Sequence, residues 1–251
     1  MKYKAIILDL DGTTVMPGEK NLPSSRVMTA ITRAKKKIHV CVATGRPFFS
    51  AQPLIDHLGL VEPSIIYNGV QIYDTKHKKM IVEFQLDIHV LKHIENIVKE
   101  QHISEIYFFD GIKEKLLNIK KLPKKVLGIY LPKVEPNIAH LLAEKLKRSI
   151  SSINVHITPS WTKGLLAVDI TSKAASKQHG VSKVSELLNI KKEELIGVGD
   201  SYNDFPLLMA CGLKVAMGNA VKELKDIADF IAPSVDDDGV AVVIEKFILD
   251  Q

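Results

Sequence analysis

The sequence predicts an α/β protein in two parts: a doubly wound, Rossmann-like core with a parallel sheet, and a smaller inserted α+β unit. Three observations predict this class. With 251 residues, 46% of them hydrophobic, the chain can bury one large core or two ordinary ones. An apolar run over residues 4–10 has the continuous pattern of a strand covered on both faces. Strand and helix patterns alternate on both sides of a middle segment, where the order changes.

The N-terminal part of the core alternates strand and helix. This order yields a parallel sheet, because each connection crosses the sheet with the same hand. Pro23-Ser24 is a helix start, and Asn68-Gly69 followed by short alternating runs indicates a hairpin. The expected elements are strands over 4–10, 38–43 and 64–67, helices over 24–37 and from Pro47, and a hairpin over 70–73 and 80–84.

The middle segment reads α-β-β twice, without obvious sequence identity between the two copies. Such a unit packs its helices on one face of a largely antiparallel sheet, so we expect a separate α+β cap domain over residues 86–171. Its two crossings to the core, near Gln85 and Ser172, favour a hinged lid. The expected elements are helices over 90–101 and 136–149, and strands over 103–109, 125–131, 154–158 and 165–171.

Alternation of helix and strand resumes after the cap and completes the core, which therefore comprises residues 1–85 and 172–251. We expect the two chain segments to contribute strands to one sheet. The elements are helices over 174–188, 203–210 and 239–249, and strands over 194–198 and 213–216.

The cysteine content and the lengths of the apolar runs favour a cytoplasmic protein over a secreted or membrane-spanning one. The two cysteines, Cys41 and Cys211, lie far apart in apolar surroundings, which indicates reduced thiols and a cytoplasmic protein. The first apolar run is too short for a signal peptide, and no segment approaches the roughly 20 apolar residues of a membrane span. Nothing in the sequence indicates an oligomeric state.

The net charge of +5 is the one unusual feature of the composition. It fits a nucleic-acid surface, an attraction for small anions, or solubility alone. Residues 86–171 hold 13 Lys and Arg against nine Asp and Glu, partly through the lysine-rich run Lys113–Lys125. Because the excess lies in the cap and no nucleic-acid motif is present, we interpret it as a weak bias toward small phosphates.

Polar groups follow the ends of strands that are expected to be neighbours. The sequences are Asp9-Leu10-Asp11-Gly12-Thr13, Thr44-Gly45-Arg46 and Gly199-Asp200-Ser201-Tyr202-Asn203-Asp204, and Lys177 reaches the same edge from a helix. Singly each pattern is weak, since Asp-x-Asp-Gly is a common turn and a lone lysine is usually solvated. Together they supply carboxylates, a hydroxyl, an ammonium group and backbone amides.

This set of groups suits phosphoryl transfer. Asp9 and Asp200 can hold Mg²⁺ through carboxylate oxygens, while Lys177 and Thr44 donate to phosphate oxygens beside the amides of the glycine loops. A carboxylate can also attack phosphorus and form an aspartyl-phosphate. A second carboxylate two residues later can give a proton to the leaving group and take one from water.

The order Asp-Leu-Asp-Gly-Thr, Thr-Gly-Arg, Lys and Gly-Asp-Ser-Tyr-Asn-Asp resembles the four motifs of the haloacid dehalogenase superfamily of phosphohydrolases. Asn68-Gly69-Val70, Met217-Gly218-Asn219-Ala220 and the position of the insertion resemble its Cof-like branch, which has a type IIB cap. In the cap only the layout is similar, and the cap is a short version. Gln178 stands where the family usually has glycine, which leaves Lys177 favoured over Lys173.

The resemblance implies a role for each matching residue. Asp9 is the implied nucleophile and a Mg²⁺ ligand, and Asp11 is the general acid and base that also offers its backbone carbonyl to the metal. The other implied roles are phosphate binding by Thr44, Gly45 and Lys177, metal binding by Asp200 with support from Asp204, and positions beside the substrate for Arg46, Asn68 and Asn203.

The expected function is therefore a Mg²⁺-dependent phosphoric monoester hydrolase that acts on a small phosphorylated metabolite, with sugar phosphates the most frequent class in the family. A sugar phosphomutase is the nearest alternative, because such mutases share this cap type. A non-catalytic phospho-ligand binder or a nucleic-acid binder is the alternative from another class. The intact Asp9 and Asp11 pair argues against a non-catalytic protein.

Overall fold

The computed structural model describes residues 2–18, 21–103, 105–111, 114–117, 123–160 and 162–250. The chain forms two compact units. We call Met1–Val82 with Ser176–Gln251 the core unit, and Glu83–Ala175 the inserted unit. The inserted unit begins three residues before, and ends four residues after, the range expected from the sequence. Part of the run Lys113–Lys125, including Lys113, Lys120 and Lys121, lies outside the described residues.

The core unit is built on a five-stranded parallel sheet in the order β13-β12-β11-β1-β2. The two chain segments meet in its middle, where β1 pairs with β11 on one side and with β2 on the other. All four residues of β1 are buried, as its continuous apolar pattern predicts. The strands are β1 (Ala5–Leu8), β2 (His39–Val42), β11 (Leu195–Gly199), β12 (Leu213–Ala216) and β13 (Phe230–Ile231).

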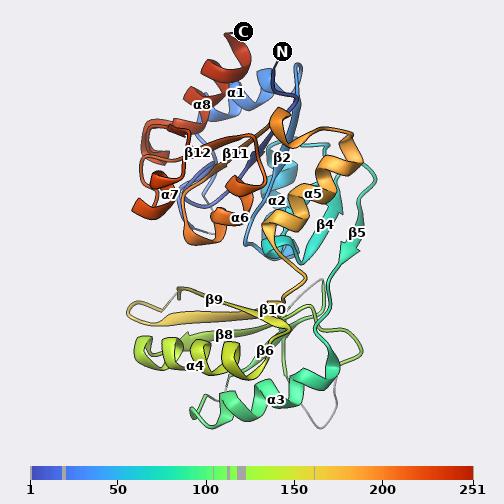
Figure 1. Cartoon of the computed structure of the whole chain (residues 1–251), viewed down its shortest axis with the longest axis vertical. Helices are drawn as coiled ribbons and strands as arrows, with labels where there is room; N and C mark the ends of the chain where they lie inside the picture. The colour runs from blue at the N-terminus through green and yellow to red at the C-terminus, as the bar shows by residue number, and fades with distance from the viewer. Residues whose placement is uncertain are drawn as a thin grey trace. The chain divides into compact units, whose positions relative to one another are not determined.

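Helices cover both faces of this sheet, which confirms the doubly wound class (Figure 1). Helices α1 and α8 pack together, and α5 packs with α6 on the opposite face. Ser24 caps α1 by accepting a hydrogen bond from the Val27 amide, and Ser176 caps α5 in the same way. The helices are α1 (Ser25–Ala34), α2 (Phe48–His57), α5 (Lys177–Leu188), α6 (Phe205–Met209), α7 (Lys222–Asp226) and α8 (Gly239–Ile244).

The third predicted strand belongs to a second, smaller sheet. β3 (Ser64–Ile66) pairs antiparallel with β4 (Gln71–Asp74), and β5 (Lys79–Glu83) completes this three-stranded sheet. β3 meets the parallel sheet through a single bridge from Ala43 to Ile65. The expected strand at residues 64–67 and the hairpin after it are therefore confirmed, although β3 joins the parallel sheet only through this one parallel bridge. The tight turn after Ile66 directs the chain back along β3 and creates the antiparallel pair.

The inserted unit is a five-stranded antiparallel sheet, in the order β7-β6-β8-β10-β9, with α3 and α4 packed on one face. Leu91 of α3, Leu142 of α4 and Ile129 of β8 lie in one apolar cluster. The expected α-β-β repeat is present, with β7 as an additional edge strand. The elements are α3 (Ile88–Lys99), α4 (Pro136–Ser149), β6 (Tyr107–Phe109), β7 (Glu114–Leu116), β8 (Gly128–Val134), β9 (Ile153–Pro159) and β10 (Leu166–Ser172).

Several short elements of the core unit were missing from the sequence-based prediction. Helix α7 and strand β13 have five and two residues, too few for a periodic pattern. The helix expected over 203–210 divides into a 3₁₀ turn over Tyr202–Asp204 and the shorter α6. The final helix continues from α8 as a π-helical turn over Glu245–Leu249. Among the described residues, no helix is both long enough and apolar enough to cross a bilayer.

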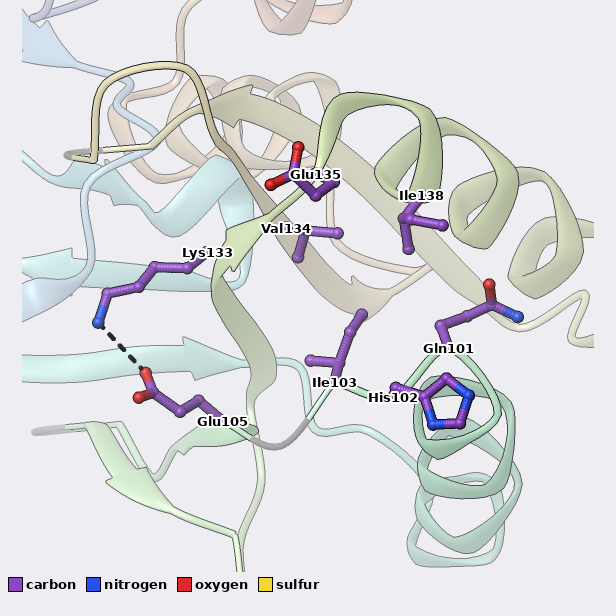
Figure 2. A pocket seen from close by; sticks show the side chains of 8 residues that line it. All are labelled: Gln101, His102, Ile103, Glu105, Lys133, Val134, Glu135 and Ile138. Carbon is purple, nitrogen blue, oxygen red and sulfur yellow. Dashed lines mark ion pairs between the residues drawn. The ribbon is translucent and has the colours of Figure 1, made fainter.

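A pocket of about 290 Å³ lies within the inserted unit, between the end of α3 and the start of α4 (Figure 2). Ile103, Val134 and Ile138 line it, and the Lys133 ammonium lies 3.6 Å from the Glu105 carboxylate at its edge. None of the predicted site residues lines this pocket. This pocket therefore does not mark the predicted chemistry, which belongs to the core unit.

Two adjacent leucines of α4 test the packing of the inserted unit. Leu142 is fully buried in the apolar cluster, whereas 54% of Leu141 is exposed. Leu142→Ala should lower the free energy of unfolding by roughly 2–5 kcal/mol, because it leaves a cavity. Leu141→Ala should change the same quantity by about 0.5 kcal/mol at most. Denaturant unfolding of both variants is the measurement, and equal losses would contradict the packing described here.

Candidate active site

The predicted site residues collect at the carboxyl ends of neighbouring strands. Asp9 directly follows β1, and its amide donates to the Val198 carbonyl of β11 at 3.0 Å. The pairing of β1 with β2 also continues beyond the last residue of β2, because the Ala43 amide donates to the Leu8 carbonyl at 2.9 Å. Thr44 is the next residue. The loops after β1, β2 and β11 consequently begin side by side, as parallel register requires.

Lys177 connects two carboxylates inside the site. Its Nζ donates to Asp9 Oδ1 and to Asp204 Oδ1, both at 2.6 Å. The three side chains are buried, Lys177 among the most completely. Burial lowers the pKa of Lys177, but attraction to Asp204 and Asp9 raises it more, so the pKa lies above its usual range. Lys177 is therefore a permanent cation at the first turn of α5.

Asp204 holds the loop after β11 in shape. Its Oδ2 accepts hydrogen bonds from the amides of Asp200 and Ser201, both at 3.0 Å, while Oδ1 receives Lys177. Each oxygen of this buried carboxylate thus already accepts from the protein. The arrangement orients the Asp200 backbone and Lys177 together, which favours a supporting position for Asp204 behind the other two carboxylates.

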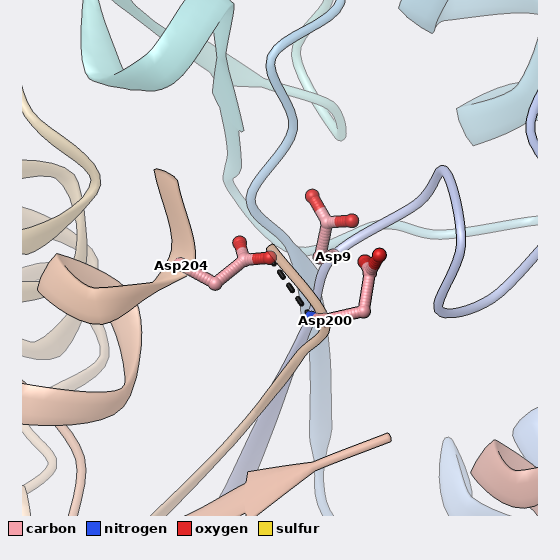
Figure 3. A group of neighbouring side chains, drawn as sticks. All are labelled: Asp9, Asp200 and Asp204. Atoms are coloured by element: carbon pink, nitrogen blue, oxygen red, sulfur yellow. Dashed lines mark hydrogen bonds between the residues drawn. The ribbon is translucent and has the colours of Figure 1, made fainter. Parts of the chain in front are cut away.

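Asp9, Asp200 and Asp204 form a group that could hold a metal ion, with one oxygen from each lying within 4.8 Å of the others (Figure 3). Burial raises the pKa of Asp9 well above its usual range, and repulsion from Asp204 adds to this effect. Burial and the same neighbour raise the pKa of Asp200 to about 6. The single ammonium of Lys177 leaves negative charge in excess here, so the donor set fits a divalent cation.

The turn after Asp9 packs directly on Asp200. Thr13 Oγ1 donates to Asp200 Oδ1 at 2.9 Å, and Thr14 Oγ1 donates to the Asp9 carbonyl at 2.6 Å. Gly12 has a φ of +81°, and a Cβ there would lie 2.4 Å from Asp200 Oδ2. Only glycine suits this close approach.

Asp11 points to a different partner from Asp9. Arg46 donates from Nε to Asp11 Oδ2 and from Nη2 to Asp11 Oδ1, each at 2.7 Å. The Arg46 amide donates to Thr44 Oγ1 at 3.0 Å. The Thr-Gly-Arg sequence therefore joins the loop after β2 to the loop after β1.

Asn68 and Asn203, both predicted to lie beside the substrate, are hydrogen bonded to each other. Asn203 Nδ2 donates to Asn68 Oδ1 at 3.1 Å, and a Cβ on Gly45 would lie 3.4–3.5 Å from these amides. Tyr67 and Asn68 have φ angles of 52° and 54°, an uncommon conformation for residues other than glycine. Such strain clusters at functional sites, where neighbouring bonds maintain it.

The predicted residues thus form one connected group within the core unit. Three further residues, for which the sequence alone implies no role, hold this group in place: Thr13, Thr14 and Asn219. Asn219 Nδ2 donates to the Gly12 carbonyl at 2.8 Å, and the Val235 amide donates to Asn219 Oδ1 at 2.9 Å. The signals for these residues were present in the sequence, since Thr13 ends the first polar loop and Asn219 lies in the Met217–Ala220 segment.

The chain is similar to known proteins along nearly all of its length. A family model described as haloacid dehalogenase-like hydrolase matches residues 6–244. The 5-amino-6-(5-phospho-D-ribitylamino)uracil phosphatase YwtE of Bacillus subtilis is 29% identical over 99% of both chains. A haloacid dehalogenase-like hydrolase from Bacteroides thetaiotaomicron has a TM-score of 0.82 and 26% identity over 98% of this chain and 100% of its own.

The fold is also that of a sugar phosphatase of haloacid dehalogenase subclass IIB. The TM-score is 0.79 at 22% identity, over 97% of this chain and 98% of the other. The resemblance predicted from the four motifs, from the Asn68-Gly69-Val70 sequence and from the type of insertion is confirmed by these similarities.

Replacement of Lys177 tests the charge balance of the site. In metal-free solution, Lys177→Met should destabilise the protein by roughly 3–5 kcal/mol at pH 7, because buried carboxylates lose their cation. Without the cation the pKa values of these carboxyls rise further in the folded state, so the loss should shrink as the pH falls toward 5. Thermal and denaturant unfolding with a chelator present are the measurements.

Lys173→Met is the matched control, because Lys173 is exposed and four residues earlier. It should leave the free energy of unfolding within about 0.5 kcal/mol of the wild type. A similar effect of the two substitutions, or a Lys177→Met defect that grows on acidification, would contradict the charge balance described.

Proposed function

The chain belongs to the haloacid dehalogenase-like hydrolases, and on that premise we propose that it is a divalent-metal-dependent phosphatase of small phosphorylated metabolites. The proposal rests on one observation above all: buried Asp9, directly after β1, is hydrogen bonded to Lys177 and lies beside the carboxylates of Asp200 and Asp204. This grouping offers a nucleophile, a phosphate donor and a metal-binding set within one edge of the sheet.

In the first step a carboxylate oxygen of Asp9 attacks phosphorus of the monoester. A bond from that oxygen to phosphorus forms, and the bond from phosphorus to the ester oxygen breaks with its electron pair on the leaving group. Asp11 gives the leaving oxygen a proton, so the alcohol departs neutral. In the second step Asp11 takes a proton from water, whose oxygen attacks phosphorus and releases Asp9 and inorganic phosphate.

Lys177 and the loop after β2 would hold the transferring group. Lys177 Nζ has three hydrogens, of which two point to Asp9 and Asp204, so one remains for a phosphate oxygen. Thr44 Oγ1 accepts from the Arg46 amide, which leaves the Thr44 hydroxyl hydrogen available to donate. The Gly45 amide lies in the same loop. These donors aim at the charge that spreads over the equatorial oxygens during transfer.

Asp9 and Asp200 would hold the metal ion, which we propose to be Mg²⁺, with the Asp11 backbone carbonyl as a third ligand. Asp204 would support the arrangement from behind, because its oxygens already accept from Lys177 and two amides. When bound, Mg²⁺ supplies charge neutralisation between the Asp9 carboxylate and the anionic phosphate. Carboxylates with raised pKa values bind such an ion with release of protons.

A sugar phosphate is the substrate class that we propose, with Arg46, Asn68 and Asn203 near the leaving group. Two of the similar proteins are named as a ribitylaminouracil phosphatase and a sugar phosphatase. Both names support a polyhydroxylated leaving group. A net charge of +4 within residues 86–171 supports an anionic substrate. The buried, unpaired thiols of Cys41 and Cys211 support a reducing, cytoplasmic setting.

Asp9→Asn tests the nucleophile. The variant should lower kcat by roughly 10⁴-fold or more, because an amide oxygen is a poor nucleophile toward phosphorus. Phosphate release from a panel of sugar phosphates with Mg²⁺ is the measurement. Asp56→Asn, which changes an exposed carboxylate of α2, is the matched control and should turn over like the wild type. Substantial Mg²⁺-dependent hydrolysis by a folded Asp9→Asn protein would refute the mechanism.

The raised pKa of Asp200, about 6, makes metal binding depend on pH. The carboxyl is mostly protonated at pH 5 and mostly charged at pH 7, and only the charged form binds Mg²⁺. Affinity should therefore weaken by about tenfold or more for each pH unit below the pKa. Calorimetric titration in buffers of different ionisation enthalpy would measure both affinity and released protons. An affinity that stays constant between pH 5 and 7 is the result that contradicts this account.

A further inference from the structure

The guanidinium of Arg46 is directed at Asp11 in a two-point contact. Nε and Nη2 reach different oxygens of the carboxylate, each at 2.7 Å. The side chain of Arg46 is 8% exposed and that of Asp11 is 38% exposed. A bidentate ion pair of this kind fixes the plane of the carboxylate as well as its position.

Arg46 is itself held at several points. Nη2 also donates to the Gly18 carbonyl at 2.9 Å, which ties the guanidinium to the loop that follows Asp11. Its backbone amide donates to Thr44 Oγ1, and its carbonyl accepts from the Tyr67 amide at 3.0 Å. Both the backbone and the head group of Arg46 are therefore fixed before any ligand binds.

Asp11 needs such an anchor more than Asp9 does. The Asp9 carboxylate is buried and is held by Lys177, whereas the Asp11 side chain reaches solvent. Without a partner, a partly exposed carboxylate samples several rotamers, and a proton donor works only within hydrogen-bond reach of the atom it serves. Each carboxylate oxygen has two lone pairs, so the contacts with Arg46 leave one on each oxygen for a proton.

We propose that Arg46 is a positioning residue, which sets the orientation of the Asp11 carboxylate for proton exchange with the leaving group and then with water. This inference rests on the proposed phosphatase function. It gives Arg46 a role near the leaving group that acts through Asp11, because Nε and Nη2 donate to the Asp11 carboxylate and Nη2 also donates to the Gly18 carbonyl. The phosphoryl group has Lys177 as its cation instead.

Leaving-group dependence separates positioning of Asp11 from phosphate binding. The leaving group of glucose 6-phosphate is an alkoxide, which needs a proton. The leaving group of p-nitrophenyl phosphate is a stable phenolate, which does not. Arg46→Ala should lower kcat for glucose 6-phosphate by about 10²-fold, with no comparable loss for p-nitrophenyl phosphate. Asp11→Asn should show the same pattern. A residue that binds the transferring phosphoryl group would slow both substrates alike when it is removed.

Two further experiments distinguish the orientation of the Asp11 carboxylate from the positive charge at position 46. Arg46→Lys keeps the charge but lacks the planar fork, so it should resemble Arg46→Ala on glucose 6-phosphate. Added guanidinium ion should restore part of the lost activity of Arg46→Ala, and added ammonium ion should not. Arg26→Ala, which removes an exposed ion pair with Glu245, is the control and should match the wild type.

Equal losses on both substrates, full activity of Arg46→Lys, or an Arg46→Ala protein as active as the wild type would each overturn the proposal. If the wild-type protein hydrolyses no phosphate ester, the proposed phosphatase function fails instead.

The contact between Arg46 and Asp11 can be tested without any activity by ¹⁵N NMR. The Arg46 Nε–H signal, assigned by its loss in Arg46→Ala, should shift and exchange faster with water in Asp11→Asn. An unchanged signal would overturn the proposal without reference to activity.

Discussion

The buried ammonium of Lys177 is the interaction on which the site depends. It joins Asp9, directly after β1, to Asp204, 195 residues later in the chain, at 2.6 Å from each. One ammonium does not balance the carboxylates gathered around it. The raised pKa values of Asp9 and Asp200 follow first from burial and then from repulsion between these carboxylates. The site therefore retains negative charge, which attracts a metal ion.

This charge arrangement requires the parallel sheet. Asp9 and Asp200 come together because β1 and β11 are parallel neighbours in which Leu8 lies opposite Val198, so both carboxylates follow within two residues of this pair. Gly12 permits the turn after β1 to touch Asp200, and Asn219 holds that turn from the loop after β12. The residues of the site are therefore positioned by backbone geometry, and their side chains need little freedom. Preorganised donors of this kind lower a barrier without reorganisation during the reaction.

The sequence was sufficient to predict the long periodic helices and strands and the loops that contain the polar site residues. α4 begins and ends at the residues predicted, because proline marks its start and an apolar stripe runs through it. β7, α7 and β13 were missed, because two to five residues carry no period. The pairing of Arg46 with Asp11, and of Asn203 with Asn68, depends on how two loops face each other. Spacing along the chain contains no information about such contacts between distant residues.

In the proposed mechanism the phosphoryl group is transferred to Asp9 before it reaches water. Borohydride reduces an acyl phosphate to an alcohol, so it converts a phosphorylated aspartate into homoserine at that position. The most direct measurement is therefore a borohydride quench during turnover, followed by peptide mass mapping of residues around Asp9. We expect homoserine at position 9, dependent on substrate and metal, and an unmodified Asp11. Turnover without any modification of Asp9, or reduction at another aspartate, would contradict it.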